Sequence, residues 1–76
     1  MASTTRTTVS YRWLYQAGNQ WVPFDPTSNV KIEDIWRSNR PYTFYIPCLG
    51  GDATIHPSEL YMERQGIRIP IIRSGA

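Results

Sequence analysis

The chain is poor in the residues from which catalytic and metal sites are built. Among its 76 residues there is one cysteine, Cys48, and one histidine, His56. An intrachain disulfide is therefore impossible, and the sequence disfavours a cysteine-based zinc site. No set of acid, base and nucleophile stands out, so we expect neither an enzyme nor a bound cofactor. Because a small fold without disulfides suits a reducing compartment, we expect an intracellular protein, either cytoplasmic or nuclear.

Long apolar runs are also missing. No stretch approaches the roughly 20 apolar residues that span a bilayer, so we expect no membrane partner. Residues 1–9 are rich in Ser and Thr and lack the apolar centre of a secretory signal. We expect a disordered leader over residues 1–9, a single domain over residues 10–74 and a short tail over residues 75–76.

Lysine is nearly absent, because seven of the eight basic residues are arginine and Lys31 is the exception. The net charge of +2 is mild, and without a dense basic stripe nucleic acid is not an expected partner. Arg64, Arg68 and Arg73 lie close together in the last quarter of the sequence. A guanidinium group fits phosphate or carboxylate in a planar fork, but a solvated basic surface explains the same residues equally well.

Aromatic residues, by contrast, are abundant: three Trp, five Tyr and two Phe, and a few such side chains can dominate a small core. Runs rich in them, bounded by turn residues, predict strands over residues 10–16, 20–24, 42–46, 53–56, 60–64 and 67–73. Pro70 inside the last strand predicts an edge strand or a bulge. The expected fold class is α+β, with a curved half-barrel antiparallel sheet and one α-helix packed across it.

The helix is predicted between the first two strands and the third. Asp25 is a suitable N-cap, and Pro26 suits the first helical position because its missing N–H costs nothing there. The Asn-Arg-Pro run at residues 39–41 ends the helix.

One face of this helix is apolar, with Ile32, Ile35 and Trp36 at helical spacing. Glu33 lies on the flank of that stripe. An unpaired buried carboxylate is costly, so we expect Glu33 to be bonded to a Trp indole N–H, to backbone N–H groups or to an arginine.

The order of Trp13, Trp21 and Glu33 resembles the signature of the WWE domain, a family named for two tryptophans and one glutamate. The run Asn-Gln-Trp-Val-Pro-Phe-Asp at residues 19–25 and Lys-Ile-Glu-Asp at residues 31–34 resemble the same family. The resemblance covers about residues 10–73. It implies an intracellular module found in ubiquitin ligases and ADP-ribosyltransferases. It also implies binding of ADP-ribose-containing groups, either poly(ADP-ribose) with its iso-ADP-ribose unit or terminal ADP-ribose.

The resemblance also implies partners and site residues. The partners are an ADP-ribose-type ligand, an ADP-ribosylated protein or a protein of the ubiquitin pathway. Tyr15 would stack on adenine or ribose, Arg68 and Arg73 would contact phosphates, and Gln65 would supply an amide. A register shift of one residue would place Ile69 instead of Arg68 at the phosphate position.

Three positions depart from the polymer-binding members of the family. Val22, Ala53 and Met62 stand where those members place a second aromatic residue, a tyrosine and a glutamine. These departures favour an alternative, a protein-interaction or scaffold module with a degenerate pocket. Such a module would dock through the aromatic strand 42–46 or the last hairpin, and a small RNA-binding sheet is a third possibility.

Several of the same aromatic residues have a structural explanation. We expect Trp13 and Trp21 to be core residues, because a small domain has few other large side chains to bury. Glu33 is expected to anchor that core rather than to act as a general base. Tyr42 and Tyr45 could line a pocket or fill the core, and the sequence leaves both open.

Overall fold

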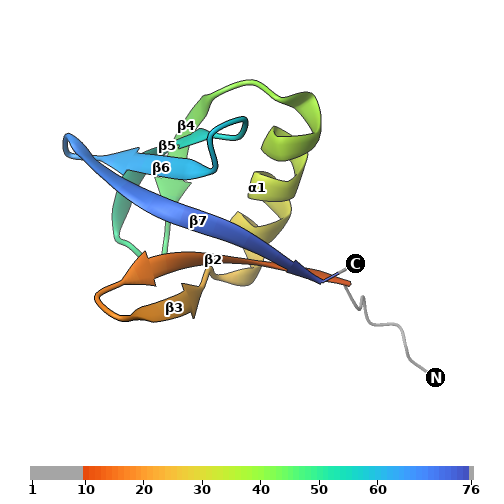
Figure 1. The fold of residues 1–76 in the computed structure, drawn as a ribbon. Helices are drawn as coiled ribbons and strands as arrows, with labels where there is room; N and C mark the ends of the chain where they lie inside the picture. Colours follow the sequence, from red (N-terminus) through yellow and green to blue (C-terminus); the bar gives the residue numbers. More distant parts are fainter. Residues whose placement is uncertain (1–9, 76) are drawn as a thin grey trace.

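The computed structural model describes residues 10–75, and within them the chain forms six strands and one helix (Figure 1). The elements are β2 (Tyr11–Ala17), β3 (Gln20–Pro23), α1 (Pro26–Ser38), β4 (Tyr42–Ile46), β5 (Gly51–His56), β6 (Tyr61–Arg64) and β7 (Ile67–Gly75). The strands form one open antiparallel sheet in the order β3-β2-β7-β6-β5-β4. The predicted α+β class is therefore confirmed.

The predicted strand bounds agree with the structure to within about two residues. Gly51, predicted to lie in a loop, is the first residue of β5 and pairs with Ile46. Gly75, predicted to lie in a tail, is the last residue of β7 and pairs with Tyr11. The expected leader over residues 1–9 lies outside the described residues.

Of the two alternatives predicted from Pro70, an edge strand or a bulge, the edge strand is wrong. β7 crosses the centre of the sheet (Figure 1) and pairs with β6 through residues 67–70 and with β2 through residues 71–75. Pro70 lies where β7 exchanges one neighbour for the other, and the N–H of the next residue, Ile71, donates to the carbonyl of Leu60 at 3.1 Å. A proline is tolerated at this position because the missing N–H falls at the end of a pairing rather than inside it.

Helix α1 begins and ends as predicted. The Asp25 carboxylate accepts hydrogen bonds from the backbone N–H and hydroxyl of Ser28, at 3.0 and 2.9 Å, and from the hydroxyl of Thr27 at 2.7 Å. Burial alone would raise the pKa of Asp25, but these hydrogen bonds together outweigh it and hold the pKa far below its usual value. At the other end Asn39 adopts a left-handed conformation with φ 57°, which is a common way to close a helix.

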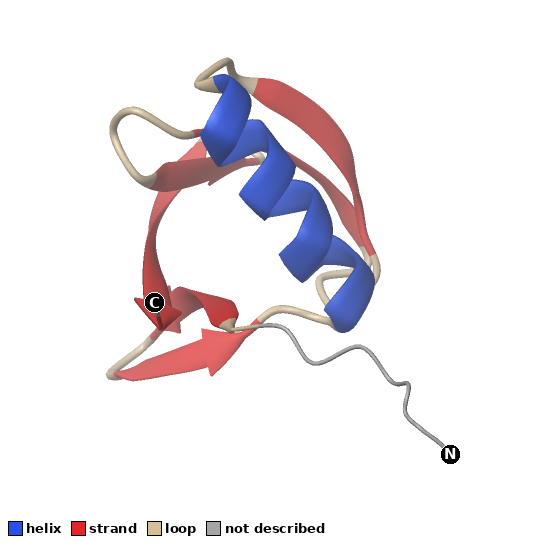
Figure 2. Ribbon diagram, turned by 90° about the vertical axis from the view of Figure 1, so that its right-hand side faces the viewer, coloured by secondary structure: helices blue, strands red, loops and turns tan. Residues whose placement is uncertain are grey.

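One hydrophobic cluster joins buried residues of α1 to residues on one face of the sheet, which we call the inward face. Figure 2 shows the strands in an open arc with α1 in front of it. The buried apolar residues of the cluster come from β2, β4, β5, β6, β7, the segment before α1 and the helix itself: Trp13, Phe24, Ile32, Ile35, Ile46, Ala53, Ile55, Met62 and Ile71. Helix and sheet therefore share one hydrophobic cluster.

The two signature tryptophans differ in burial. Trp13 is fully buried, as expected, whereas the expectation for Trp21 is wrong because 41% of its surface is exposed. Trp21 pairs with Gln16, one residue out of phase with Trp13 and Tyr15 along β2. Since side chains alternate along a strand, that register places Trp21 on the outer face of the sheet.

Candidate functional site

Glu33 lies at the centre of the domain and joins three elements. The indole Nε1–H of Trp13 on β2 donates to its Oε1 at 2.8 Å. Arg73 on β7 donates through Nε to Oε1 at 2.9 Å and through Nη2 to Oε2 at 2.8 Å. Glu33 is 2% exposed, and the Arg73 guanidinium holds its pKa below the usual range, with the Trp13 indole adding to the effect against burial.

The guanidinium of Arg73 is also enclosed by aromatic rings. It lies 4.6 Å from the Trp36 ring centre and 5.4 Å from that of Tyr11. The Trp36 ring in turn meets Trp13 edge-on at 5.8 Å. The charge of Arg73 is balanced by Glu33, so its guanidinium has a structural role at the edge of the core. The predicted role of Arg73 as a phosphate-binding residue would require these contacts to be shared with a ligand.

A second buried polar contact ties α1 to β2. The backbone N–H of Trp13 donates to Oδ1 of Asn29 at 2.7 Å, and Nδ2 of Asn29 donates to the carbonyl of Tyr11 at 3.4 Å. Asn29 is 7% exposed and lies one helical turn before Glu33. Asn29 is not among the residues predicted from the sequence, although a polar side chain four positions before Glu33 lies on the same helix face.

Tyr15 lies where the turn over residues 47–50 approaches β2. Its ring packs on Phe24 with centroids 4.9 Å apart, and its hydroxyl lies against the Cys48 thiol. Burial raises the pKa of Tyr15, and the neighbouring thiol raises it further. Leu49 packs against the core from the same turn.

Arg64 borders the same turn; the sequence grouped it with Arg68 and Arg73 but assigned it no ligand-binding role. Its Nη2 donates to the carbonyl of Leu49 at 2.9 Å, while its Nε is buried without a hydrogen-bond partner among residues 10–75. Arg64 lies two residues after the fully buried Met62 on β6. Strand alternation relative to Met62 was the signal that could have placed it on the inward face.

Arg68 lies on the opposite face of the sheet from Tyr15. Its guanidinium is 4.8 Å from the Tyr61 ring, which stacks on His56 at 4.4 Å. The inward position beside it belongs to Ile69, which pairs with Met62 and packs against the core. The structure therefore does not bring Tyr15 and Arg68 together.

Gln65, the fourth predicted ligand residue, is exposed in the turn between β6 and β7 with φ 53°. Among residues 10–75 no group of three or more His, Cys, Asp or Glu side chains is placed to hold a metal ion. Within the same residues no helix is long and apolar enough to cross a membrane.

A family model of the WWE domain matches residues 11–66. The chain belongs to the WWE domain family. The resemblance seen in the sequence is thereby confirmed. Comparison with curated proteins and with solved structures found no match to this chain.

The WWE signature divides by role in this domain. Trp13 and Glu33 form a buried hydrogen-bonded pair that Arg73 completes, whereas Trp21 faces outward. WWE domains are protein-interaction modules as a family. In this WWE domain, Ala53 and Met62, two of the three residues that depart from polymer-binding members, are 2% and 0% exposed.

Proposed function

We propose that this WWE domain is a non-catalytic interaction module that binds a partner protein. The observation that supports it best is the separation of Tyr15 and Arg68 on opposite faces of the sheet. Binding of a nucleoside diphosphate group needs an aromatic surface for the base and positively charged donors for the phosphates, within reach of one another. With Arg73 bonded to Glu33, the predicted set does not converge on one ligand.

The apolar side chains on the inward face of the sheet also support a protein-interaction function. Val22 pairs with Tyr15, and Ala53 and Met62 lie within the apolar core. The aromatic and amide side chains that polymer-binding members of the family are expected to have at these positions are replaced here by apolar side chains. A domain that keeps the fold and loses such a pocket can act through its outer surfaces.

A second candidate is binding of an ADP-ribose-containing group, such as iso-ADP-ribose or terminal ADP-ribose. Tyr15 and Arg64 both border the turn over residues 47–50, through Cys48 and Leu49 respectively. Tyr15 would stack on the adenine or ribose, and Arg64 would take over the phosphate-binding role predicted for Arg68. The specific observation that favours this candidate is that an aromatic ring and a guanidinium group border the same turn.

Affinity purification from extracts in which ADP-ribose polymer has been enzymatically removed tests the first candidate. We expect the partner to be retained by the domain with and without polymer. Loss of every specific partner on polymer removal would overturn the proposal and favour the second candidate.

Calorimetric titration with iso-ADP-ribose and with ADP-ribose tests the second candidate directly. Saturable heat, together with NMR shifts at Tyr15 and Arg64 that are lost in Arg64→Met, would support it. No heat and no shifts at millimolar ligand would exclude it.

A further inference from the structure

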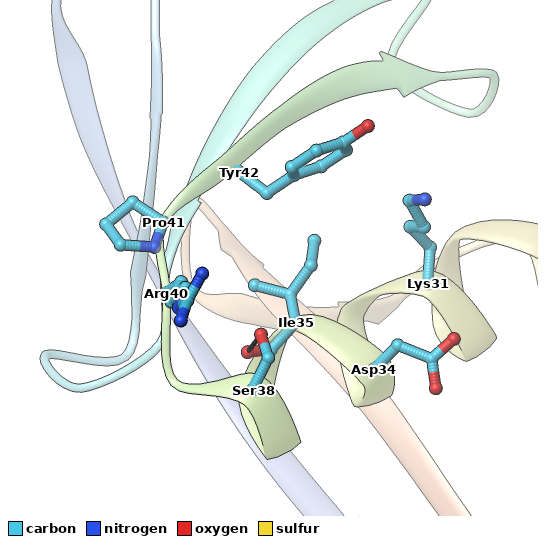
Figure 3. A pocket seen from close by; sticks show the side chains of 7 residues that line it. All are labelled: Lys31, Asp34, Ile35, Ser38, Arg40, Pro41 and Tyr42. Atoms are coloured by element: carbon cyan, nitrogen blue, oxygen red, sulfur yellow. Dashed lines mark hydrogen bonds between the residues drawn. The ribbon is translucent and has the colours of Figure 1, made fainter.

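A groove runs between α1 and β4, away from Tyr15 and from the Glu33 centre. It has a volume of about 660 Å³ and is drawn in Figure 3. Its lining comes from the helix, from the connection that follows it and from the start of β4: Lys31, Asp34, Ile35, Ser38, Arg40, Pro41 and Tyr42.

The groove reaches Tyr42, the first residue of the edge strand β4. β4 is the last strand of the sheet order and, among residues 10–75, pairs with β5 alone. At its far end the carbonyl of Ile46 already accepts hydrogen bonds from Leu49 and Gly50, both at 3.0 Å. The residue of β4 that lines the groove, Tyr42, lies at the opposite end of this edge strand.

A free edge presents unpaired N–H and C=O groups that can bind an added strand. Added strands of this kind are a recurring mode of peptide recognition, in which backbone hydrogen bonds give affinity and side-chain pockets give specificity. Here α1 lies beside β4 across the groove (Figure 3). An extended peptide along β4 would consequently have the helix as its second wall.

The middle of the groove is apolar. Ile35 lies between the helix and the strand, and Tyr42, half exposed at 50%, covers it from β4 (Figure 3). Side chains of an added strand alternate in direction. One apolar side chain of such a peptide would face Ile35 and Tyr42, and its neighbours would point away.

The charged residues of the groove indicate the charge of the peptide that would bind there. Lys31 holds its ammonium 4.7 Å from the Tyr42 ring, and Arg40 lies in the connection at the other end of the lining. Neither forms a salt bridge among residues 10–75, and Asp34 is the one acid in the lining. Two cations against one carboxylate favour an acidic ligand, and they disfavour a second copy of the same groove because like charges repel.

We propose that this groove binds an extended acidic segment of a partner protein, which adds a strand to the edge of β4. An apolar side chain of the segment packs on Ile35 and Tyr42, and flanking carboxylates pair with Lys31 and Arg40. The inference rests on the proposed interaction function and assigns that function a surface.

In the experiment, a displayed library of random 12-residue peptides is selected for binding to the unlabelled wild-type domain. The ¹⁵N-labelled domain is kept for NMR titration. We expect enrichment of peptides with an apolar residue flanked by Asp or Glu. A synthetic copy of an enriched peptide should shift the amide signals of residues 42–45 and of Lys31 in the labelled domain. Enriched peptides without acidic residues, or shifts confined to another face, would overturn the proposal.

Two variants and a modified peptide make the assignment specific. The double variant Lys31→Glu/Arg40→Glu should weaken binding by about tenfold or more, while Arg12→Glu, an exposed substitution on β2, should leave it unchanged. Two further peptides carry N-methyl groups on the odd-numbered or on the even-numbered amides. One of the two should fail to bind, because its methyl groups replace the N–H donors that face β4. Equal binding by both methylated peptides would exclude strand addition.

Further outcomes separate this inference from the function on which it rests. A partner protein retained equally by wild type and by the Lys31→Glu/Arg40→Glu variant would refute the groove and leave the interaction function standing. Strongly salt-dependent binding of a single-stranded RNA oligonucleotide, lost in the same variant, would assign the groove to nucleic acid and overturn the proposal. The spectrum of each variant in the absence of ligand shows whether it is folded.

Discussion

Trp13 and Glu33, twenty positions apart in the chain, are joined by a 2.8 Å hydrogen bond from the indole Nε1 to the carboxylate Oε1. Both residues are buried, and Arg73 closes the arrangement from a third element. A buried carboxylate would be unfavourable alone, but its hydrogen bonds and the guanidinium compensate for its lost hydration. The pair therefore sets how α1 meets β2 and β7.

Glu33→Gln should destabilise the domain by about 2–4 kcal/mol, because it keeps the side-chain shape but removes the charge that partners the guanidinium of Arg73. Urea denaturation followed by tryptophan fluorescence measures the change. Asp34→Asn, on the exposed side of the same helix, is the matched control and should change stability by less than about 0.5 kcal/mol. Equal effects of the two substitutions would contradict a structural role for the carboxylate.

The two signature tryptophans should respond differently to removal. Trp13→Ala should cost about 3–5 kcal/mol, as is typical for large core aromatics, and could leave the domain unfolded. Trp21→Ala should cost less than about 2 kcal/mol because the side chain already has 41% of its surface exposed. Denaturation midpoints of both variants, with Trp13→Phe as a milder substitute, test this order. A larger loss for Trp21→Ala would show that its outer-face contacts matter more than burial.

Asn29→Ala should destabilise the domain by about 1–3 kcal/mol, because it leaves the buried N–H of Trp13 without an acceptor. Amide hydrogen exchange at Trp13 gives a local readout, and we expect faster exchange in the variant than in the wild type. Val30→Ala, at a position 46% exposed on the same helix, serves as control. Unchanged exchange at Trp13 would mean that another acceptor replaces Oδ1 of Asn29.

Stability should fall in acid through Asp25 and Glu33. Both carboxylates have a folded-state pKa below the ordinary value, so each stabilises the fold above its unfolded pKa of about 4. That contribution is lost as pH falls from about 4 through the lower folded values. Urea denaturation across pH should therefore show a nearly flat free energy of unfolding between about pH 5 and pH 7 and a decline below about pH 4.

Asp25→Asn tests the share of the helix N-cap in this decline. Asparagine keeps a capping oxygen but does not titrate, so the variant should lose less stability between neutral pH and acid than the wild type. Asp25→Ala removes the cap itself and should cost about 0.5–2 kcal/mol at neutral pH. A pH profile identical to that of the wild type in Asp25→Asn would exclude the Asp25 contribution.

Much of the local structure could be predicted because it depends on neighbours in sequence. Asp25, Pro26 and Asn39 carry the start and end of α1 in their own backbone preferences and hydrogen bonds. The alternation of apolar residues and the turn residues between strands gave their approximate bounds. The need of Glu33 for a partner also followed from the sequence, since the cost of an unpaired buried carboxylate does not depend on the fold.

The candidate site was harder to predict because it depends on which way each side chain faces. Tyr15 and Arg68 belong to strands that never pair with each other at those positions, and β7 changes neighbours at Pro70. A shift of one residue in register reverses the facing of a whole strand. Arg68 thus faces outward and Ile69 inward, as the alternative register allowed.

By itself, the sequence determined the family, the α+β class and the two residues, Trp13 and Glu33, on which the core depends. These follow from composition, spacing and the cost of burying charge, which are properties of short segments. Only the tertiary structure decided that Trp21 is exposed, that Arg73 partners Glu33 and that β4 leaves a free edge beside α1. Such features arise from strand order and register, which are set by contacts between residues far apart in the chain.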